Sequence, residues 1–263
     1  MTTTADKLTL KVGPITTRYE VRGSGPPLLY LHGAFGYAEW PEFLNAMTDS
    51  FTVYAPTHPG FEGDSDIDHI QDLLELTLYH ADMIDAMGLD SPHVVGHYSG
   101  AMVAAEMAAV RAVDIGKLVL AAPAGFWQDN NPGLDYNTTP ATEMRQALFA
   151  DPDSDAALRI YPVPKDDEEL GWQIIHRVQS LSTVGKFLWP IPDKGLVRRV
   201  HRIDRPTLVV VGDHDKVVPA AYAELLTSRI PDSRSHVMSN AGHMMAHEHP
   251  NEFARVVLEF LSE

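Results

Sequence analysis

A tyrosine occupies the centre of a sequence pattern that commonly presents a nucleophile. The run VVGHYSGAMVAAEMA, from Val94, is typical of a buried strand, a tight turn and a helix. Gly96 and Gly100 lie two residues before and two residues after Tyr98. Small residues at these places let the central residue occupy a strained turn without backbone clashes. Hydrolytic enzymes usually carry serine at that centre, so the chemistry of this turn depends on what Tyr98 does.

Ser99 is the alternative centre of the same turn. Centring the turn there would place His97 and Ala101 at the flanking positions, and His97 is too bulky for the first of them. The spacing therefore favours Tyr98 as the apical residue. Ser99 then begins the helix, where its backbone N–H, rather than its hydroxyl, faces the site.

Two later loops carry a candidate acid and a candidate base. The run VVVGDHDKVVP, from Val209, ends a buried strand with a glycine and acidic residues, and Asp215 is the candidate to orient a histidine. Asp213 is expected to act as a turn or capping residue instead. The run SNAGHMMAHEHP, from Ser239, supplies His243 as the candidate base.

The sequence offers little for a metal. His247 and His249 have the H-x-H spacing of a metal pair, but no third ligand is evident, and a helix entrance with Pro250 in its first turn is the expected role. The chain has no cysteine, which excludes disulfides, thiolate nucleophiles and cysteine-ligated metals. We therefore expect neither a metal nor another cofactor.

A glycine-rich loop, HGAFG, follows an early apolar strand at His32–Gly36. Its glycines let the backbone bend so that an N–H can face a reacting carbonyl, although a tight strand-to-helix turn would use the same residues. His32 itself is expected to be a buried, hydrogen-bonded residue.

The elements that must position these loops alternate between strands and helices. LTLKV and ITTRYEVRG alternate like outer antiparallel strands, whereas five apolar runs are typical of buried parallel strands: PPLLYLHG, FTVYAP, HVVG, KLVLAAP and TLVVVG. Helical patterns, such as that of Asp72–Leu89, separate them. The sequence therefore predicts an α/β fold with a mostly parallel central sheet flanked by helices, whose active site lies at the carboxyl ends of the strands.

This alternation of strand and helix patterns stops between Phe126 and Arg202. A polar, turn-rich stretch there is followed by short segments with helical patterns and without buried strands. The pattern predicts a mainly helical cap over residues 126–202, inserted into a core formed by residues 1–125 and 203–263.

Four aromatic residues are candidates to line a substrate pocket under such a cap. They are Phe35, Phe126, Trp127 and Trp189. Ordinary packing of the cap on the core would use the same residues. A pocket lined by them would suit an apolar or aromatic ligand.

Composition narrows the partners. The formal net charge of −16 argues against nucleic acid or an anionic membrane, and a small molecule is the expected partner. The start MTTTADKLTL has no basic region followed by a long apolar run, and no apolar stretch approaches the roughly 18 residues of a spanning helix. The cytoplasm is the expected location. The sequence leaves the oligomeric state open.

Together these motifs resemble the α/β-hydrolase superfamily, in which nucleophile, acid and base follow the chain order of Tyr98, Asp215 and His243. The resemblance covers nearly the whole chain and includes the segment PTHPGFEGDSD. It points to the capped, small-substrate branch: esterases, C–C-bond hydrolases, haloalkane dehalogenases and epoxide hydrolases. It implies an oxyanion hole made by the N–H groups of Ala34 and Ser99, with Asp215 orienting His243.

Tyrosine at the apex departs from this pattern at the residue the reaction needs most. Its oxygen lies at the end of a rigid ring, so an oxyanion hole built around the elbow is no longer beside the attacking atom. Its pKa of about 10 nevertheless makes a phenolate easier to form than an alkoxide. Attack by Tyr98 is therefore chemically feasible and geometrically awkward.

Three functions remain open from the sequence. The first is an enzyme of small-molecule metabolism that hydrolyses an ester or a carbonyl-containing apolar or aromatic substrate, with water activated by His243 and Asp215, or with Tyr98 attacking or donating a proton. The second is a cofactor-free lyase, isomerase or cyclase in which Tyr98 and His243 transfer protons. The third is a ligand-binding relative without turnover, plugged by Tyr98. A tyrosine introduced in place of a natural serine would leave the same sequence.

Overall fold

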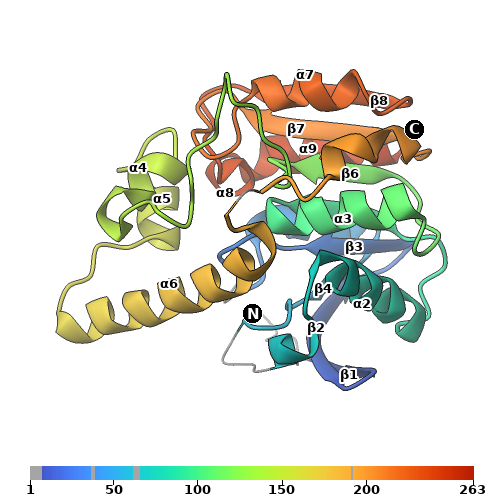
Figure 1. Cartoon of the computed structure of the whole chain (residues 1–263), viewed down its shortest axis with the longest axis horizontal. Coiled ribbons are helices and arrows are strands. Elements are labelled where there is room, and N and C mark those ends of the chain that lie inside the picture. Colours follow the sequence, from blue (N-terminus) through green and yellow to red (C-terminus); the bar gives the residue numbers. More distant parts are fainter. Residues whose placement is uncertain (1–7, 37–38, 62–65, 191) are drawn as a thin grey trace.

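An eight-stranded sheet forms the centre of the computed structural model, which describes residues 8–36, 39–61, 66–190 and 192–263 (Figure 1). Antiparallel pairing joins β1 to β2 and β2 to β4, and the remaining pairs are parallel in the order β4-β3-β5-β6-β7-β8. The bounds are Leu8–Val12 (β1), Ile15–Gly23 (β2), Pro27–Leu31 (β3), Thr52–Pro56 (β4), His93–His97 (β5), Leu118–Ala121 (β6), Thr207–Gly212 (β7) and Ser233–Met238 (β8). The predicted, mostly parallel sheet is confirmed.

Helices cover both faces of this sheet. α2 (Leu73–Ala86) and α3 (Ser99–Val110) lie in front of it, and α9 (Pro250–Leu261) lies behind it (Figure 1). Three shorter helices complete this part of the chain: α1 (Glu42–Asn45), α7 (Ala221–Thr227) and α8 (Met245–Glu248). The side chain of Asp72 caps α2 by accepting the Glu75 N–H at 2.9 Å, and Pro250 opens α9.

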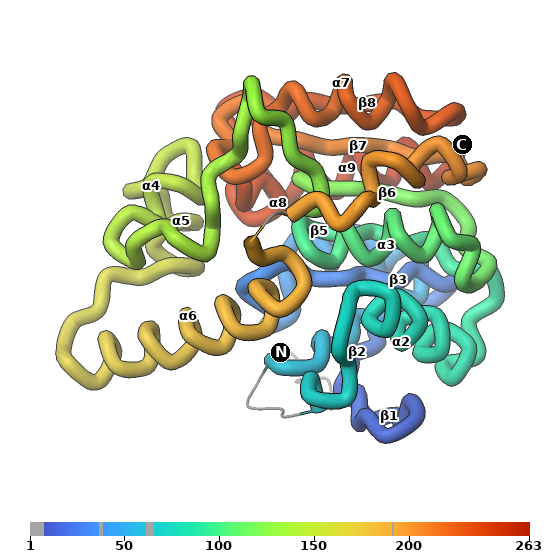
Figure 2. Tube along the Cα trace, in the orientation of Figure 1, coloured from blue at the N-terminus to red at the C-terminus, as the bar shows by residue number. Residues whose placement is uncertain are grey.

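The chain between β6 and β7 adds a separate group of helices, which we call the β6–β7 segment (residues 122–206). It leaves the sheet, forms α4 (Met144–Leu148) and α5 (Asp155–Ile160), and returns along α6 (Asp167–Leu188), as Figure 2 shows. The described residues of this segment contain no strand. Residues 195–203 have a sequence pattern that predicts a helix. They form two 3₁₀ turns instead, η4 (Leu196–Arg198) and η5 (Val200–Arg202).

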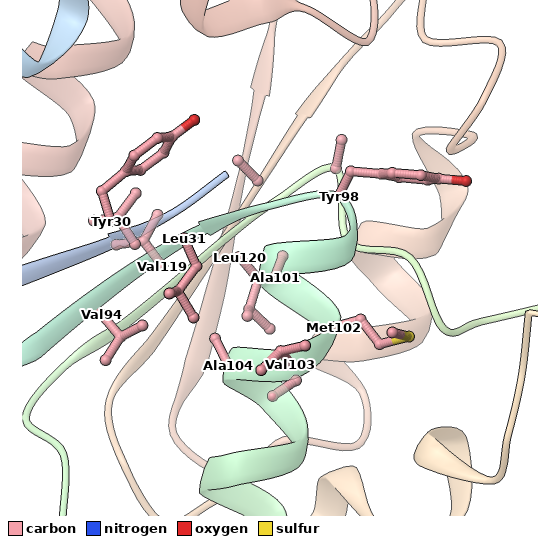
Figure 3. Close-up of a cluster of buried hydrophobic side chains, with 14 of the residues drawn as sticks. Tyr30, Leu31, Val94, Tyr98, Ala101, Met102, Val103, Ala104, Val119 and Leu120 are labelled. Atoms are coloured by element: carbon pink, nitrogen blue, oxygen red, sulfur yellow. The ribbon is translucent and has the colours of Figure 1, made fainter. Parts of the chain in front are cut away.

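Small residues of α3 bring this helix close to the sheet. Figure 3 shows its first turns packed against aliphatic side chains of β3, β5 and β6. Ala101 and Ala104 are fully buried there. Alanine lets the backbone of α3 approach the sheet closely. The strand before the turn and the helix after it therefore both pack into the core, which holds the turn between β5 and α3 in place. The residues of this cluster include Leu31, Val94, Val103, Val119 and Leu120.

Three buried histidines connect the glycine-rich loop after β3 with α2. The His32 ring donates to the Gly33 carbonyl at 2.7 Å and accepts the backbone N–H of His58 at 2.9 Å. The His58 Nδ1 lies 2.8 Å from Nε2 of His80, whose Nδ1 donates to the Leu76 carbonyl at 2.8 Å. The expectation that His32 is a buried, hydrogen-bonded residue is confirmed. Residues 62–65 of the neighbouring PTHPGFEGDSD segment lie outside the described residues.

Burial sets the protonation state of these rings. It lowers the pKa of both His32 and His80 from 6.5 to about 4, and it lowers the pKa of His58 well below its ordinary value. Between about pH 6.5 and pH 4 the unfolded chain therefore binds protons that the folded chain does not, and folding stability falls as the pH falls through this window.

We expect His80→Gln to flatten this pH dependence, because the glutamine amide still offers the His58 ring a hydrogen-bonding group but does not titrate. The free energy of unfolding, measured with urea between pH 7 and pH 4.5, should change by about 1 kcal/mol less per pH unit near pH 5 than in the wild type. His176→Gln serves as the control, since His176 is exposed on α6. Equal slopes for His80→Gln and the wild type would contradict the assignment.

Candidate active site

Tyr98 stands at the apex of the turn between β5 and α3. Its backbone has φ of +49° and ψ of −108°, a strained conformation that a non-glycine residue rarely adopts. The Tyr98 N–H donates to the Ala121 carbonyl at 3.0 Å, and its own carbonyl accepts the N–H groups of Met102 at 3.0 Å and Ala124 at 3.1 Å. These bonds fix the apex between two strands and a helix. Ser99 is the first residue of α3.

The two flanking glycines have no room for a side chain. A Cβ atom on Gly96 would lie 2.5 Å from the Ala101 Cα, and one on Gly100 would lie 2.2 Å from the Leu31 carbonyl oxygen. Both contacts are with backbone atoms, which cannot move aside cheaply. The spacing G-x-Y-x-G is therefore required by the approach of α3 to β3 and β5.

His243 and Asp215 form a buried pair beside this turn. Asp215 follows β7 and His243 follows β8, so parallel strand order brings the two loops together. The His243 Nδ1 lies 3.0 Å from the Asp215 Oδ2, and the two side chains are 3% and 0% exposed. The other carboxylate oxygen of Asp215 accepts the N–H groups of Val217 and Val218, both at 2.8 Å. The carboxylate is thus held in one orientation against the imidazole.

Two neighbours hold the histidine loop. The His97 ring donates to the His243 carbonyl at 3.0 Å, so this residue of the elbow fixes the backbone of the candidate base. Asp213, which was expected to be a turn residue, accepts the N–H of Ala241 at 3.1 Å. Neither side chain replaces Asp215 at the imidazole.

The Tyr98 ring packs edge-on against His243, with ring centroids 4.9 Å apart and an interplanar angle of 87°. Within the described residues no hydrogen bond joins the Tyr98 hydroxyl to His243. Figure 3 shows the Tyr98 ring extending away from the aliphatic cluster, with its hydroxyl at the far end. Burial, followed by the nearby Tyr136 and Asp215, raises the pKa of Tyr98, so the phenol stays protonated at neutral pH.

Tyr98 also lines an open pocket of about 540 Å³, mouth included, between the loops after β6 and β7 and the β6–β7 segment. Of the four predicted lining residues, Phe126 and Trp127 border this pocket. Phe35 lies outside it and stacks edge-on against Tyr136 and Tyr161. Trp189 is 48% exposed and is not brought to it.

A second, more apolar pocket lies on the other side of the elbow, between α2, α3 and α6. Ser99 borders it together with side chains such as Phe61, Met102 and Phe187. The two pockets share Leu188, and the adjacent elbow residues line different pockets, Tyr98 the first and Ser99 the second.

The loop after β3, which contains Ala34, lies beside the elbow. A Cβ on Gly33 would lie 3.3 Å from the Tyr98 Cβ, so the loop packs directly against the elbow. Within the described residues, neither the Ala34 N–H nor the Ser99 N–H donates to another group of the chain. An oxyanion hole requires such unpaired donors, and the assignment of this role to Ala34 and Ser99 stays a prediction.

Sequence patterns missed the residues that hold this loop from the opposite side. Ser180 of α6 donates to the Ala34 carbonyl, and the Ser180 hydroxyl lies 2.8 Å from the Tyr136 hydroxyl. Arg177 in turn donates to the Tyr136 carbonyl at 2.9 Å and covers its ring at 4.7 Å. Because Ser180 and Ala34 are 146 residues apart, no local pattern connects them.

Within the described residues, no three histidine, aspartate or glutamate side chains are arranged so that they could hold a metal ion. The His247 ring packs against Phe43, whereas His249 donates to the Asn240 carbonyl at 2.9 Å and precedes Pro250 at the start of α9.

Comparison with known proteins gives the family. The chain belongs to the alpha/beta hydrolase family, whose model matches residues 28–256. The chain is 28% identical to the 2-hydroxy-6-oxo-6-(2'-aminophenyl)hexa-2,4-dienoic acid hydrolase of Metapseudomonas resinovorans, over 96% of this chain and 90% of that protein. It is 26% identical to the 2-hydroxy-6-oxo-6-phenylhexa-2,4-dienoate hydrolase of Burkholderia cepacia, over 91% and 89%.

Solved structures share the fold. A serine hydrolase of carbazole degradation superimposes with a TM-score of 0.78 and 24% identity, over 98% of this chain and 99% of that one. A membrane phospholipase A gives a TM-score of 0.81 with 23% identity, over 98% and 86%. The predicted α/β-hydrolase fold is thus confirmed, and the chain is a hydrolase-type enzyme of small-molecule metabolism. Among the described residues, no helix has the length and apolar character needed to cross a membrane.

We expect Gly100→Ala and Ser99→Ala to differ sharply. The first places a methyl group against the Leu31 carbonyl and should cost about 3 kcal/mol or more, because the contact is with backbone. The second removes only a hydroxyl and should leave the melting temperature within about 2 °C of the wild type. Thermal unfolding followed by circular dichroism measures both. A strongly destabilised Ser99→Ala variant would show that the elbow is centred elsewhere.

Proposed function

We propose that this protein hydrolyses a small apolar or aromatic carbonyl compound without a cofactor. The buried contact between His243 and Asp215 carries the proposal. A carboxylate fixed by two backbone N–H groups orients the imidazole, so that the opposite ring nitrogen can take a proton from the attacking group. In this proposal the N–H groups of Ala34 and Ser99 hold the oxyanion.

Water is the attacking group in this proposal. The protonated phenol of Tyr98, its hydroxyl at the far end of the ring and the missing hydrogen bond to His243 all disfavour attack by the tyrosine. His243 takes a proton from water as the water oxygen bonds to the carbonyl carbon. The carbonyl oxygen becomes the oxyanion, and the leaving group then departs with the proton from His243. The Tyr98 hydroxyl donates a hydrogen bond to the substrate.

We propose that residues 126–202 of the β6–β7 segment act as a cap. The core on which this cap lies consists of residues 1–125 and 203–263. Phe126 and Trp127 of the cap border the pocket that Tyr98 lines. Its helix α6 contacts the loops of the site through Ser180 and through Thr183, whose hydroxyl donates to the Gly60 carbonyl at 3.1 Å. We propose that this cap selects the substrate.

We also propose that the protein acts in the cytoplasm, as expected from its sequence.

The substrate class follows from the pocket and the relatives. Aromatic and aliphatic side chains dominate the lining around Tyr98, which suits a ligand with an aromatic or apolar part. Two relatives are named as hydrolases of phenyl- or aminophenyl-substituted oxo-hexadienoates. We therefore propose a carbonyl compound with an aryl or alkyl substituent, cleaved at an ester or at a C–C bond next to the carbonyl.

A second candidate is cofactor-free proton transfer, as in a lyase or isomerase. One observation favours it: a protonated phenol and an imidazole lie in ring contact at the same site, which suits an acid and a base acting on one carbonyl compound. The products distinguish the two candidates, because only hydrolysis incorporates oxygen from water.

Activity should depend on His243 and on the Tyr98 hydroxyl. With p-nitrophenyl acetate, p-nitrophenyl butyrate and 2-hydroxy-6-oxo-6-phenylhexa-2,4-dienoate as substrates, we expect His243→Ala to lower kcat by about 10²- to 10⁴-fold. Tyr98→Phe should lower it by about 10²-fold, through the loss of one donor. Tyr98→Ser should show a burst of p-nitrophenol, because a short nucleophile then stands between His243 and the two N–H groups.

The same assays contain the outcomes that would contradict the water route. A burst in the wild type, with an acyl group on Tyr98 in the intact mass, would make the tyrosine the nucleophile. Turnover without ¹⁸O incorporation from labelled water would favour the lyase candidate. Turnover by Tyr98→Ser alone would mean that Tyr98 plugs the site.

We expect Ser180 to position the oxyanion loop without touching substrate. Ser180→Ala should lower kcat about tenfold and change KM less than twofold, because the Ala34 carbonyl loses its donor. Ser180→Thr should restore most of kcat. Ser182→Ala is the matched control, since the Ser182 hydroxyl bonds only within α6, to the Val178 carbonyl. A lowered melting temperature with unchanged kcat would assign Ser180 to stability alone.

A further inference from the structure

One stretch of α6 exposes an unusual amount of apolar surface. Five large apolar side chains within nine residues are 43% to 57% exposed, and we call them the α6 apolar face: Leu170, Trp172, Ile174, Ile175 and Val178. Figure 1 shows that the first half of α6 extends beyond the sheet and the helices that cover it. A contiguous exposed patch of this kind marks an interaction surface more often than scattered apolar residues do.

The α6 apolar face is not the face that holds the helix in the fold. Four of the five buried residues of α6, namely Ser180, Thr183, Val184 and Phe187, lie on the other side of the helix, and the fifth, Leu188, is buried at its C-terminal end. Successive residues turn by about 100°, so the α6 apolar face spreads over about 200° on the side away from them. One side of the helix therefore packs on the site, whereas the side chains of the α6 apolar face are only about half covered by the described residues.

A glycine in the middle of this face indicates what covers it. Gly171 costs the helix about 1 kcal/mol relative to alanine, and a Cβ there would meet no atom within 4 Å. Among the described residues, no contact thus requires a glycine at this position. A second helix crossing the face would use it, because its absent side chain lets another backbone or a branched side chain come close.

The negative charge at the start of α6 disfavours binding to an anionic lipid surface. It also disfavours a parallel pairing of α6 with a second copy of itself. Four consecutive acidic residues, Asp166 to Glu169, begin α6, and the whole chain carries a formal charge of −16. An anionic bilayer would repel this end. If two copies of α6 paired in parallel, their acidic starts would adjoin.

In an antiparallel pair centred between Ile174 and Ile175, the acidic starts lie about 21 Å apart, well beyond the roughly 8 Å screening length at physiological ionic strength. That register also sets Val178 of one copy over Gly171 of the other. Side-chain shape and charge therefore agree on the same arrangement.

We propose that the α6 apolar face joins two copies of this protein through an antiparallel α6–α6 contact. The five half-exposed side chains offer on the order of 400 Å² per copy, about half of the area that a stable interface buries on each partner. The dimer should accordingly dissociate in the micromolar range. This proposal does not depend on the reaction that the site performs.

Sedimentation velocity from about 0.5 to 200 μM tests the contact. We expect the wild type to shift from monomer to dimer over this range, and Ile174→Lys and Ile175→Lys to raise the dissociation constant at least tenfold. Leu74→Lys on α2 is the matched control, because Leu74 is 57% exposed outside the α6 apolar face and should leave the dimer intact. Melting temperatures of all variants should stay near that of the wild type.

The absence of natural cysteines allows a second, sharper test. Under mild oxidation, Ile174→Cys should form a disulfide-linked dimer, whereas Asp167→Cys and Leu74→Cys should not. Efficient cross-linking at Asp167→Cys would overturn the antiparallel arrangement. A wild type that stays monomeric to 200 μM, a dimer unaffected by Ile174→Lys and Ile175→Lys, or a monomer that sediments with phosphatidylcholine vesicles would overturn the proposal.

Discussion

The close approach of α3 to the carboxyl ends of β3 and β5 is the constraint on which the rest of the site depends. Gly96 and Gly100 permit it, because a Cβ at either position would enter the backbone of Ala101 or Leu31. The approach drives Tyr98 into its strained φ and leaves the Ser99 N–H at the free start of the helix. Since β3 leads into the loop of Ala34, the same contact sets where the second N–H lies.

A tyrosine at this apex changes the chemistry that the unchanged backbone can support. The turn, the His243–Asp215 contact and the two N–H groups all suit a short nucleophile at position 98, whereas the phenol carries its oxygen past them into the pocket. Burial keeps that phenol protonated, so it can donate a hydrogen bond but is a poor attacking group. In the proposed mechanism, His243 therefore activates water, which is small enough to fit between the imidazole and a carbonyl carbon.

The sequence predicted those parts of the protein that short patterns determine. Alternating strands and helices, the clearance needed around Tyr98 and the loop order of Asp215 and His243 all depend on near neighbours or on the topology of a parallel sheet. The mostly parallel sheet and the family are confirmed by the structure and by the comparisons. The roles of the site residues remain predictions.

Contacts between distant segments could not be predicted in this way. Ser180 reaches Ala34 only because α6 returns to the sheet after a long excursion of the chain. Phe126 and Trp189 are both aromatic residues of one segment, yet only Phe126 borders the pocket. Which of them does so is decided by the path of the chain and not by residue type.

The two sides of helix α6 have different surroundings. One side carries Ser180 and Thr183 to the loops of the site, where small shifts of the helix would move the Ala34 carbonyl. The other side exposes apolar residues around Gly171, a combination that costs stability in a lone chain. A second copy seated on that side would limit how far α6 can move, and so would hold the oxyanion loop without touching the substrate.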